Sequence, residues 1–335
     1  MGERCVVVGA GGISNAWFGP LKAEKVKVAG IVDLRTDLAK AQADKYQLDA
    51  MISSDLKDTL KKTRPDFVVD LTIPEAHCGV TCTALAAGAH VIGEKPMAAS
   101  MAQARKMVRC SQETGKLYMV SQSRRWQPME TVMRRTLESG QVGDITTVNC
   151  DFYIGVHFGG FREEMPSPLI LDMSIHHFDL VRYMSGLDPV AVYAKEFNPK
   201  GSWFKGDVSA ICIFEMTGGV VFTYRGSWCG YGCDTSWNGD WRFIGTRGTM
   251  LYERDQLPRG QVADKDFHKP FKDVKVKPLA LKHNGMHGAL REMLTFLRTG
   301  QQPQTHCQDN IKSLAMVFAA IESSRKGRRV PIRAM

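Results

Sequence analysis

The chain has 335 residues, long enough for two domains, and its 44% hydrophobic and 24% charged content excludes an intrinsically disordered protein. No apolar run approaches the roughly 20 residues of a membrane helix, and the run after Met1 is too short for a signal-peptide core, so we expect a cytoplasmic protein without a membrane partner. The formal net charge of +9 favours anionic ligands, and nine scattered cysteines indicate free thiols rather than a disulfide framework.

The first 120 residues alternate short apolar runs with helical patterns. The expected strands are 5–8, 26–32, 67–71, 90–92 and 117–120, and the expected helices include 39–46, 55–62, 79–87 and 101–113. This alternation predicts an α/β domain with a doubly wound parallel sheet and right-handed crossovers, which is the Rossmann fold.

The second half changes character after a helix expected at 128–139. Strand-like runs follow at 145–153, 190–197, 209–215, 220–227, 241–245 and 249–252, and hairpin signals join several of them. Further helices are expected at 171–184, 286–298 and 307–324. We therefore predict a second, α+β domain with a large, mostly antiparallel open sheet, and we divide the chain into domains 1–121 and 122–335.

Lysines recur between residues 265 and 282 and alternate there with apolar residues, as on an exposed strand. A nucleic-acid interface would need a basic face or a recognition motif as well. Solvated lysines at a sheet edge also discourage aggregation, and we favour that interpretation. No nucleic-acid partner is therefore expected.

A glycine-rich turn, Gly9-Ala-Gly11-Gly12-Ile13-Ser14, follows the first strand and opens a helix. Gly9 permits a tight turn, and Gly11 lets backbone N–H groups approach a pyrophosphate at the helix N-terminus. The second strand ends in Asp33, whose carboxylate can accept both ribose hydroxyls and so favours NAD over NADP. Arg35 leaves the choice open, because it can pair with a 2′-phosphate or stack on adenine.

The most specific motif lies after two further strands. Thr72-Ile73-Pro74-Glu-Ala-His77 follows the strand at 67–71, and Gly93-Glu94-Lys95-Pro96 follows the strand at 90–92. These residues resemble the Gfo/Idh/MocA oxidoreductase family, whose hallmark is Glu-Lys-Pro at this position, and the resemblance covers essentially the whole chain. An ammonium at the carboxyl end of a strand can polarise a carbonyl or stabilise an alkoxide. The resemblance assigns Lys95 to catalysis and implies a cis peptide before Pro96.

The segment Ser121-Gln-Ser123-Arg124-Arg125-Trp126-Gln-Pro128 is similar to a family segment that lies beside the nicotinamide. Arg125 falls on the family arginine and Trp126 on its aromatic residue. Ser123 replaces the usual asparagine, so that polar contact is absent from this chain's pattern.

A second strong motif is Asp172-Met-Ser-Ile-His176-His177, within the helix expected at 171–184. Residues four apart share a helix face, so Asp172 and His176 pair while His177 points about 100° away. A carboxylate beside an imidazole orients the ring, and the pair can take a hydroxyl proton while its carbon loses hydride. The motif resembles the family's Asp-x3-His, in which histidine is the general base.

Two weaker signals remain. His283 and His287 are four apart, but no carboxylate or third histidine accompanies them at motif spacing, so we expect a helix face and no metal. Trp228, Trp237 and Trp241 suit either carbohydrate stacking or sheet packing.

The expected function is oxidation of a secondary hydroxyl of a sugar, glycoside or cyclic polyol, or reduction of the ketone, by hydride exchange with NAD, NADP being the less favoured cofactor. The rival enzyme class is an NAD-dependent glycosidase that oxidises sugar C3 transiently, and a third class is a non-catalytic NAD-sensing regulator. We expect a homodimer or homotetramer, as the resemblance implies. The expected catalytic residues are Lys95, Asp172 and His176. The expected cofactor-binding residues are Gly9, Gly11, Gly12, Ile13, Asp33, Leu34, Arg35, Thr72, Ile73, Pro74, His77, Glu94, Lys95, Arg125 and Trp126. The expected substrate-binding residues are Lys95, Arg125, Tyr153, Asp172, His176 and Trp237.

Overall fold

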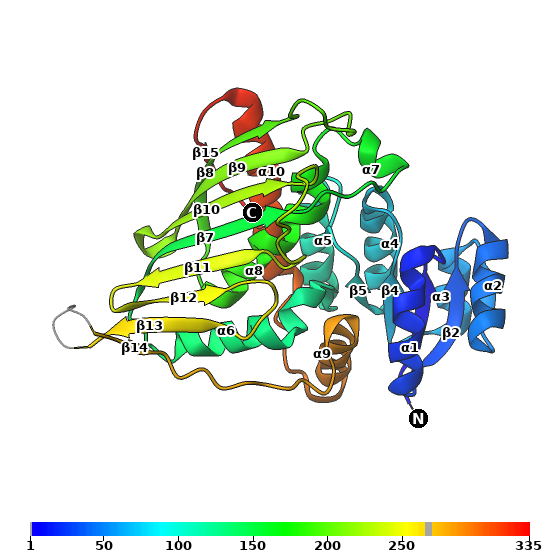
Figure 1. Cartoon of the computed structure of the whole chain (residues 1–335). Coiled ribbons are helices and arrows are strands. Elements are labelled where there is room, and N and C mark those ends of the chain that lie inside the picture. Colours follow the sequence, from blue (N-terminus) through cyan, green and yellow to red (C-terminus); the bar gives the residue numbers. More distant parts are fainter. Residues whose placement is uncertain (1, 265–269) are drawn as a thin grey trace. The chain divides into compact units, whose positions relative to one another are not determined.

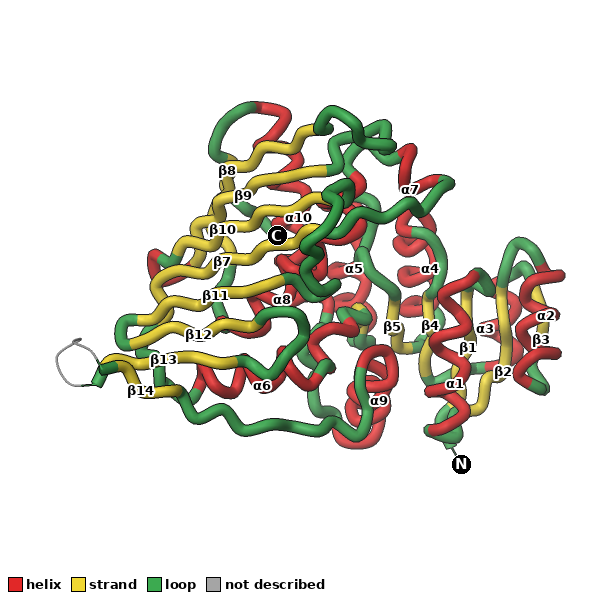
Figure 2. Tube along the Cα trace, viewed as in Figure 1, coloured by secondary structure: helices red, strands yellow, loops and turns green. Residues whose placement is uncertain are grey.

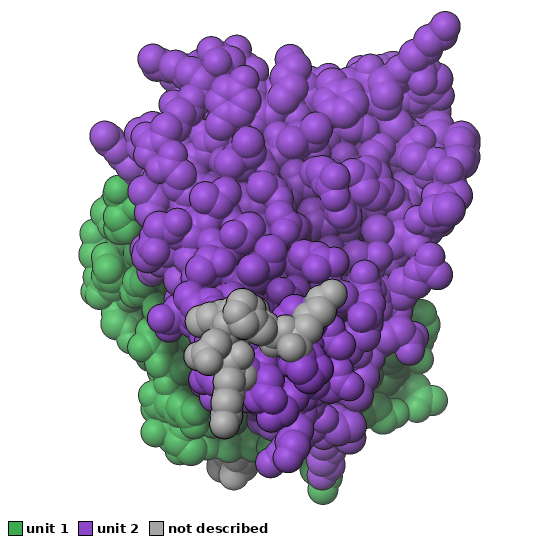
Figure 3. Space-filling view, turned by 60° about the vertical axis from the view of Figure 1, so that its left-hand side comes forward, with its two compact units in different colours: residues 1–126, 283–311, 335 green, residues 127–282, 312–334 purple. Residues whose placement is uncertain are grey.

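The structure, a computed structural model, describes residues 2–264 and 270–335 and separates into two compact units. Unit 1 comprises the described residues of 1–126 together with 283–311 and 335, and unit 2 comprises those of 127–282 together with 312–334 (Figure 3). The expected domain boundary at residue 121 falls shortly before this division. The expected second domain also included residues 283–311, which here belong to unit 1. The expected division into domains stays a prediction.

Unit 1 is built on a six-stranded sheet in the order β3-β2-β1-β4-β5-β6 (Figure 1). Its strands are β1 (Arg4–Val8), β2 (Lys27–Val32), β3 (Met51–Ser53), β4 (Phe67–Asp70), β5 (His90–Gly93) and β6 (Tyr118–Val120). Every neighbouring pair is parallel, so the Rossmann prediction is confirmed. The short edge strand β3 was not predicted, because three half-buried residues carry too little apolar pattern.

The helices of unit 1 lie between these strands and after the last of them. They are η1 (Gly12–Ser14), α1 (Asn15–Ala23), α2 (Thr36–Tyr46), α3 (Leu56–Thr63), α4 (Pro74–Ala86), α5 (Met101–Thr114), η2 (Ser123–Trp126) and α9 (Gly285–Thr299). Local signals fix their ends: the Ser100 side chain caps α5, and Pro74 occupies the first turn of α4. The core between sheet and helices includes Trp17 and Leu21 of α1 and Leu290 of α9.

The strand order reverses between β1 and β4, which defines a switch point at the carboxyl ends of the strands. Ligands of open α/β sheets bind at this position. The residues that follow β1, β2, β4 and β5 are the glycine turn, Asp33, Leu71–Ile73 and Glu94-Lys95. The predicted cofactor motifs of unit 1 therefore share one edge of its sheet.

Unit 2 contains a nine-stranded sheet in the order β14-β13-β12-β11-β7-β10-β9-β8-β15 (Figure 2). Its strands are β7 (Ile145–Tyr153), β8 (Pro189–Phe197), β9 (Ser209–Met216), β10 (Val221–Ser227), β11 (Asp240–Gly245), β12 (Gly248–Tyr252), β13 (Arg259–Ala263), β14 (Phe271–Asp273) and β15 (Val330–Pro331). Within this sheet, β7 and β10 are the only parallel pair among the described strands, so the predicted mostly antiparallel sheet is confirmed.

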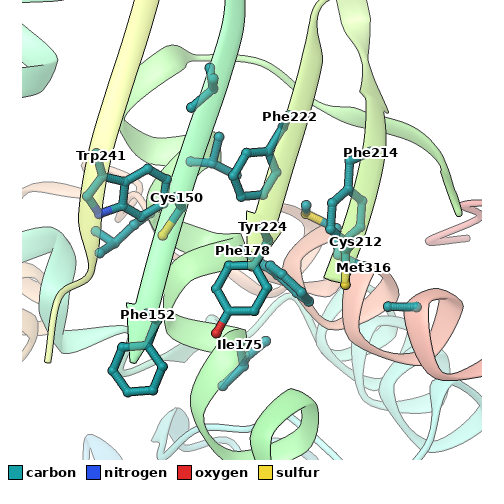
Figure 4. Close-up of a cluster of buried hydrophobic side chains, with 14 of the residues drawn as sticks. Cys150, Phe152, Ile175, Phe178, Cys212, Phe214, Phe222, Tyr224, Trp241 and Met316 are labelled. Carbon is teal, nitrogen blue, oxygen red and sulfur yellow. The ribbon is translucent and has the colours of Figure 1, made fainter. Parts of the chain in front are cut away.

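One face of this sheet is covered by helices. The helical elements of unit 2 are α6 (Pro128–Glu138), α7 (Phe161–Glu164), the π-helix η3 (Leu169–Ser174), α8 (Ile175–Ser185) and the short η4 (Thr217–Gly219). The helix α10 (Cys307–Lys326) belongs to unit 1 up to Ile311 and to unit 2 from Lys312. Figure 4 shows Phe214, Phe222 and Tyr224 of the sheet close to Phe178 of α8, in the buried core of unit 2.

The lysine-rich stretch at 265–282 includes an edge strand. β14, which carries Lys272, is the outermost strand on its side of the sheet, as the edge interpretation predicts. Two other lysines of that stretch, at 265 and 269, lie outside the described residues. Within the described part of the chain, no helix has the length and apolar character needed to span a bilayer.

Candidate active site

The glycine turn of unit 1 is held against β2 and β4. Gly9 has a φ of +97°, and a Cβ at that position would meet the Leu71 carbonyl oxygen at 2.7 Å. The turn therefore needs a glycine for two reasons, its positive φ and the close approach of the chain after β4. Among the residues that the structure describes, none has an atom within 4 Å of the Cβ positions of Gly11 and Gly12, so the exposed start of the helix is open to a ligand.

Asp33 organises the same turn. Its Oδ2 accepts a hydrogen bond from Ala10 N at 2.7 Å, and its Oδ1 accepts one from Arg35 N at 2.8 Å. Each carboxylate oxygen has a second lone pair that can accept a ribose hydroxyl. The Arg35 guanidinium donates to Asp37 at 2.8 Å, and both side chains are exposed. Arg35 is thus held by a weak surface pair that a ligand can displace.

Three predicted cofactor residues of unit 1 have large apolar side chains that are exposed. Among residues 2–126, the exposed large apolar side chains are Ile13 at 39%, Leu34 at 91% and Ile73 at 65%. Leu34 follows β2, Ile73 follows β4, and Ile13 lies in η1. Large side chains left open at the ligand-binding edge of a sheet mark a binding surface.

A buried polar network lies behind Lys95. Asp70 and His77 are both buried, with His77 Nδ1 3.1 Å from Asp70 Oδ2, and the Thr72 hydroxyl donates to Asp70 Oδ1 at 2.6 Å. Glu94 is also buried, and its Oε1 accepts the indole N–H of Trp17 at 2.9 Å. Burial raises the pKa of Glu94, while the Trp17 hydrogen bond and the Lys95 charge act in the opposite direction.

This network changes the interpretation of two predicted cofactor residues. His77 and Glu94 face the interior of unit 1, where they support neighbouring residues, and their predicted cofactor contact stays a prediction. Trp17 and Asp70 were missed by the sequence analysis, since a tryptophan in a helix and an aspartate at a strand end carry no motif. The Lys95–Pro96 peptide is cis, as predicted.

Arg125 and Trp126 are buried in unit 1 as well. Arg125 donates to the Gln304 carbonyl oxygen at 3.1 Å and to Asp309 Oδ2 at 3.0 Å. Trp126 packs against helix α9, where a Cβ on Gly288 would lie 2.4 Å from the Trp126 Cβ. Both residues thus have structural partners, and their predicted roles beside the cofactor and substrate stay predictions.

In unit 2, Asp172 lies in the π-helix η3 and His176 in the first turn of α8. The sequence analysis placed both residues in one α-helix, and the wider π turn means that the α-helical angle between them does not apply. One partner of Asp172 is Arg162 of α7, whose Nε donates to Oδ2 at 2.6 Å. The Arg162 guanidinium also lies 5.3 Å from the ring centroid of Phe158 and 4.8 Å from that of Phe161.

His177 lies in the core of unit 2. It is fully buried, and its ring lies 4.8 Å from Phe152, 5.5 Å from Tyr224 and 6.2 Å from Trp241, measured between centroids. The prediction that His177 packs elsewhere is confirmed. His176 is only partly buried, so of the two histidines it is the one open to a ligand.

The structure separates the tryptophans that pack in the sheet from the one that is open to a carbohydrate. Trp228 and Trp241 are buried in the sheet core, so packing is correct for them. Trp237 is 44% exposed and lies 6.1 Å from the ring of Phe152, which also contacts His177. Tyr153 follows Phe152 on β7, so its side chain lies on the opposite face of the sheet. The predicted substrate contacts of Tyr153 and Trp237 stay predictions.

Known protein families match both parts of the chain. Residues 3–122 match the family model described as "Oxidoreductase family, NAD-binding Rossmann fold", and residues 131–251 match the "GFO/IDH/MocA C-terminal domain". The chain is 28% identical to a D-apiose dehydrogenase of Rhizobium rhizogenes over 287 residues, covering 81% of this chain and 80% of that one.

Two solved structures share the whole fold. An oxidoreductase from Agrobacterium radiobacter in complex with NAD+, L-tartaric acid and magnesium has a TM-score of 0.87, with 22% identity over 99% of each chain. Levoglucosan dehydrogenase in complex with NADH has a TM-score of 0.86, with 16% identity over 100% of each chain.

Proposed function

This chain belongs to the Gfo/Idh/MocA family of oxidoreductases, and we propose that it oxidises a secondary hydroxyl of a sugar, glycoside or cyclic polyol, or reduces the ketone, with NAD as cofactor. The relatives that support this substrate class are named as dehydrogenases of D-apiose and levoglucosan. The observation that carries the cofactor assignment is the exposed apolar group of Ile13, Leu34 and Ile73 beside the glycine turn.

The residues of unit 1 fit a dinucleotide in three independent ways. Gly9 holds the turn, and the unobstructed backbone at Gly11 and Gly12 suits a pyrophosphate. The three exposed apolar side chains suit the flat faces of two heterocyclic rings. Asp33, held by two backbone N–H groups, suits the adenosine ribose and disfavours a 2′-phosphate, so we propose NAD rather than NADP.

The proposed proton chemistry rests on His176 and Lys95. NAD, when bound, supplies the hydride acceptor for the carbon that is oxidised. His176 takes the hydroxyl proton as general base, and Asp172 orients His176 or a neighbouring hydroxyl. The Lys95 ammonium stabilises the developing alkoxide. Lys95 belongs to unit 1 and His176 to unit 2.

A substrate panel tests this function. The full-length protein is incubated with polyols, aldoses and glycosides and with either cofactor, and NADH absorbance and products are measured. Stoichiometric NADH with a keto product supports the dehydrogenase. Cleavage of a glycoside without net NADH, by protein that retains NAD through gel filtration, would instead assign the NAD-dependent glycosidase. NAD binding without turnover of any substrate would assign the non-catalytic sensor.

The uncovered face of the unit 2 sheet supports an oligomer. Tyr193 of β8 and Ile213 of β9 are register neighbours and are both exposed, as is Ile211. A flat apolar sheet face of this kind is typical of a subunit interface. We propose a homodimer or homotetramer through this face, and light scattering of wild type and Ile211→Lys tests it. A monomeric wild type at micromolar concentration would contradict it.

The cysteines support a reducing compartment. All nine lie in the described residues and are free thiols, and five of them are buried. Disulfides are rare where glutathione keeps thiols reduced, so we retain the proposal of a cytoplasmic protein.

A further inference from the structure

Two histidines of unit 1 that are four residues apart lie together with a glutamate from the far end of the sequence, beside the end of α1. Glu24 is the residue that follows α1, His287 lies in the first turn of α9, and His283 just precedes that helix. One nitrogen or oxygen atom from each lies within 4.8 Å of the others. The sequence analysis set the histidine pair aside for lack of a carboxylate, and the fold supplies one 263 residues away.

The hydrogen bonds of His287 define which of its nitrogens is available. His287 Nε2 lies 2.8 Å from Glu24 Oε1, and His287 Nδ1 lies 3.4 Å from His283 Nδ1. A carboxylate accepts only, so His287 carries its proton on Nε2 and donates it to Glu24. In the neutral ring the Nδ1 lone pair is then directed toward His283.

The separation of the two Nδ1 atoms suits a shared metal ion. Two nitrogens bound to a tetrahedral zinc at about 2.0–2.1 Å are about 3.4 Å apart. The observed spacing is 3.4 Å, and the two rings are tilted by 51° rather than stacked flat. A metal-bound histidine commonly donates its other N–H to a carboxylate, which is the relation between His287 and Glu24.

Burial and charge favour a cation at this place. The Glu24 side chain is 9% exposed and that of His287 is 22% exposed, so the pair is partly shielded but reachable from water. Glu24 Oε2 also accepts a hydrogen bond from Arg291 Nη1 at 2.9 Å. Glu24 follows α1, so its side chain lies at the negative end of the helix dipole.

We propose that His283 and His287 bind a divalent cation of the borderline class, such as Zn²⁺, Ni²⁺ or Cu²⁺, through their Nδ1 atoms. Glu24 acts as the outer-shell partner that fixes the tautomer of His287, and water completes the coordination. Imidazole ligands select these ions over Mg²⁺ and Ca²⁺, which prefer oxygen. The bound ion ties the start of α9 to the end of α1, and the site is independent of the proposed catalytic chemistry.

Metal titration of matched variants tests the site. Full-length protein is stripped with a chelator, dialysed and titrated calorimetrically with Ni²⁺, and its melting temperature is recorded with and without the ion. The wild type is expected to bind one equivalent that the double variant His283→Gln/His287→Gln lacks. Glu24→Gln is expected to keep the stoichiometry with about 10–100-fold weaker binding. His306→Gln, which changes a histidine elsewhere in unit 1, is the control.

Three other outcomes would each contradict a specific part of the proposed metal site. Equal Ni²⁺ binding by wild type and the double variant would overturn the site and assign the ion to other groups, such as thiols. Unchanged affinity in Glu24→Gln would overturn the outer-shell role. The single variant His283→Gln, which leaves the His287–Glu24 hydrogen bond in place, serves if the double variant does not fold. It must also lose the equivalent, and binding at wild-type affinity would contradict the proposal.

Discussion

The Nε of Arg162 donates a hydrogen bond to Oδ2 of Asp172 over 2.6 Å, joining helix α7 to the π-helical turn of η3. The sequence assigned Asp172 to one partner, His176. The structure adds a cation that competes for the same carboxylate, with side chains 37% and 16% exposed. We therefore expect Arg162 to limit how strongly Asp172 acts on a neighbouring imidazole or substrate hydroxyl.

Replacing Arg162 tests whether this ion pair positions Asp172 for turnover. Arg162→Gln removes the charge-assisted hydrogen bond, and we expect kcat to fall about 10-fold, equivalent to about 1.4 kcal/mol of barrier. Arg162→Lys keeps the charge and should recover part of the loss. Lys205→Gln, which breaks the exposed pair with Glu164, is the matched control. Unchanged kcat and KM in Arg162→Gln would show that the Arg162–Asp172 ion pair has no role in turnover.

Lys95 gives a prediction about chemistry rather than binding. Lys95→Ala removes the ammonium that stabilises the alkoxide, and we expect kcat to fall by roughly 10²–10³. The affinity for NAD, measured by calorimetry, should stay within a few-fold of wild type. Lys106→Ala on helix α5 is the control. Near-normal turnover of Lys95→Ala would make the lysine structural.

The cofactor preference follows from Asp33. Its negative charge beside the adenosine ribose should repel a 2′-phosphate, so we expect kcat/KM to be higher with NAD than with NADP. Asp33→Ser should narrow the difference, because Arg35 then meets the phosphate without a competing carboxylate. Asp44→Ser on α2, which breaks the surface pair with Lys40, is the control. A wild-type preference for NADP would overturn the assignment.

The features that the sequence predicted are those encoded by neighbouring residues. Gly9 and Lys95 follow strands whose apolar pattern is unmistakable, so both the strand and the position of the loop could be predicted. β3 was missed because its three residues are only half buried. The π turn that carries Asp172 was missed because helix periodicity does not distinguish it from an α-helix.

The features that the sequence could not predict depend on residues brought together by the fold. Arg162 and Asp172 are ten positions apart across a loop, and Glu24 meets His287 only when α9 packs beside α1. The burial of His77 on Asp70 follows from where α4 lies on the sheet, not from a local pattern. Such partners become visible only with coordinates or with co-variation among homologues.

Glu196 of β8 makes stability depend on pH. It is buried, and burial raises its pKa to about 7, with the charge of Asp207 adding to the shift and the Ser167 hydrogen bond opposing it. A carboxyl whose pKa is raised by folding favours the folded state at low pH, and that contribution is lost as pH rises from about 4.5 through 7. Glu196→Gln should therefore match wild type at pH 5 and be more stable by about 2 kcal/mol at pH 8.

Thermal denaturation from pH 5 to pH 9 measures this difference. Glu215→Gln on β9 is the control with the opposite sign, because hydrogen bonding to Arg329 lowers the pKa of Glu215. The Glu215 variant should gain no stability at pH 8. Parallel pH profiles for wild type and Glu196→Gln would show that Glu196 is ionised without cost in the folded protein.

The neighbours His176 and His177 give the sharpest test of the proposed site. His176 is partly buried and follows η3, whereas His177 is enclosed by Phe152, Tyr224 and Trp241. His176→Ala should lower kcat by roughly 10²–10⁴, the usual worth of a positioned general base, and should abolish the low-pH limb of the rate profile. His177→Ala should leave a cavity and cost roughly 2–4 kcal/mol of folding stability, with kcat per folded molecule little changed.

The measurement is kcat across pH at saturating NAD, together with the melting temperature of each variant. His177→Phe fills the same space with a ring that cannot take a proton, so it separates packing from chemistry if His177→Ala unfolds. We expect His177→Phe to retain the wild-type pH profile and His176→Gln to lose it. If the His177 variants are the more damaging to kcat while remaining folded, the assignment of the general base is wrong. Asp172 would then lose its role as well, since that role was derived from its spacing to His176.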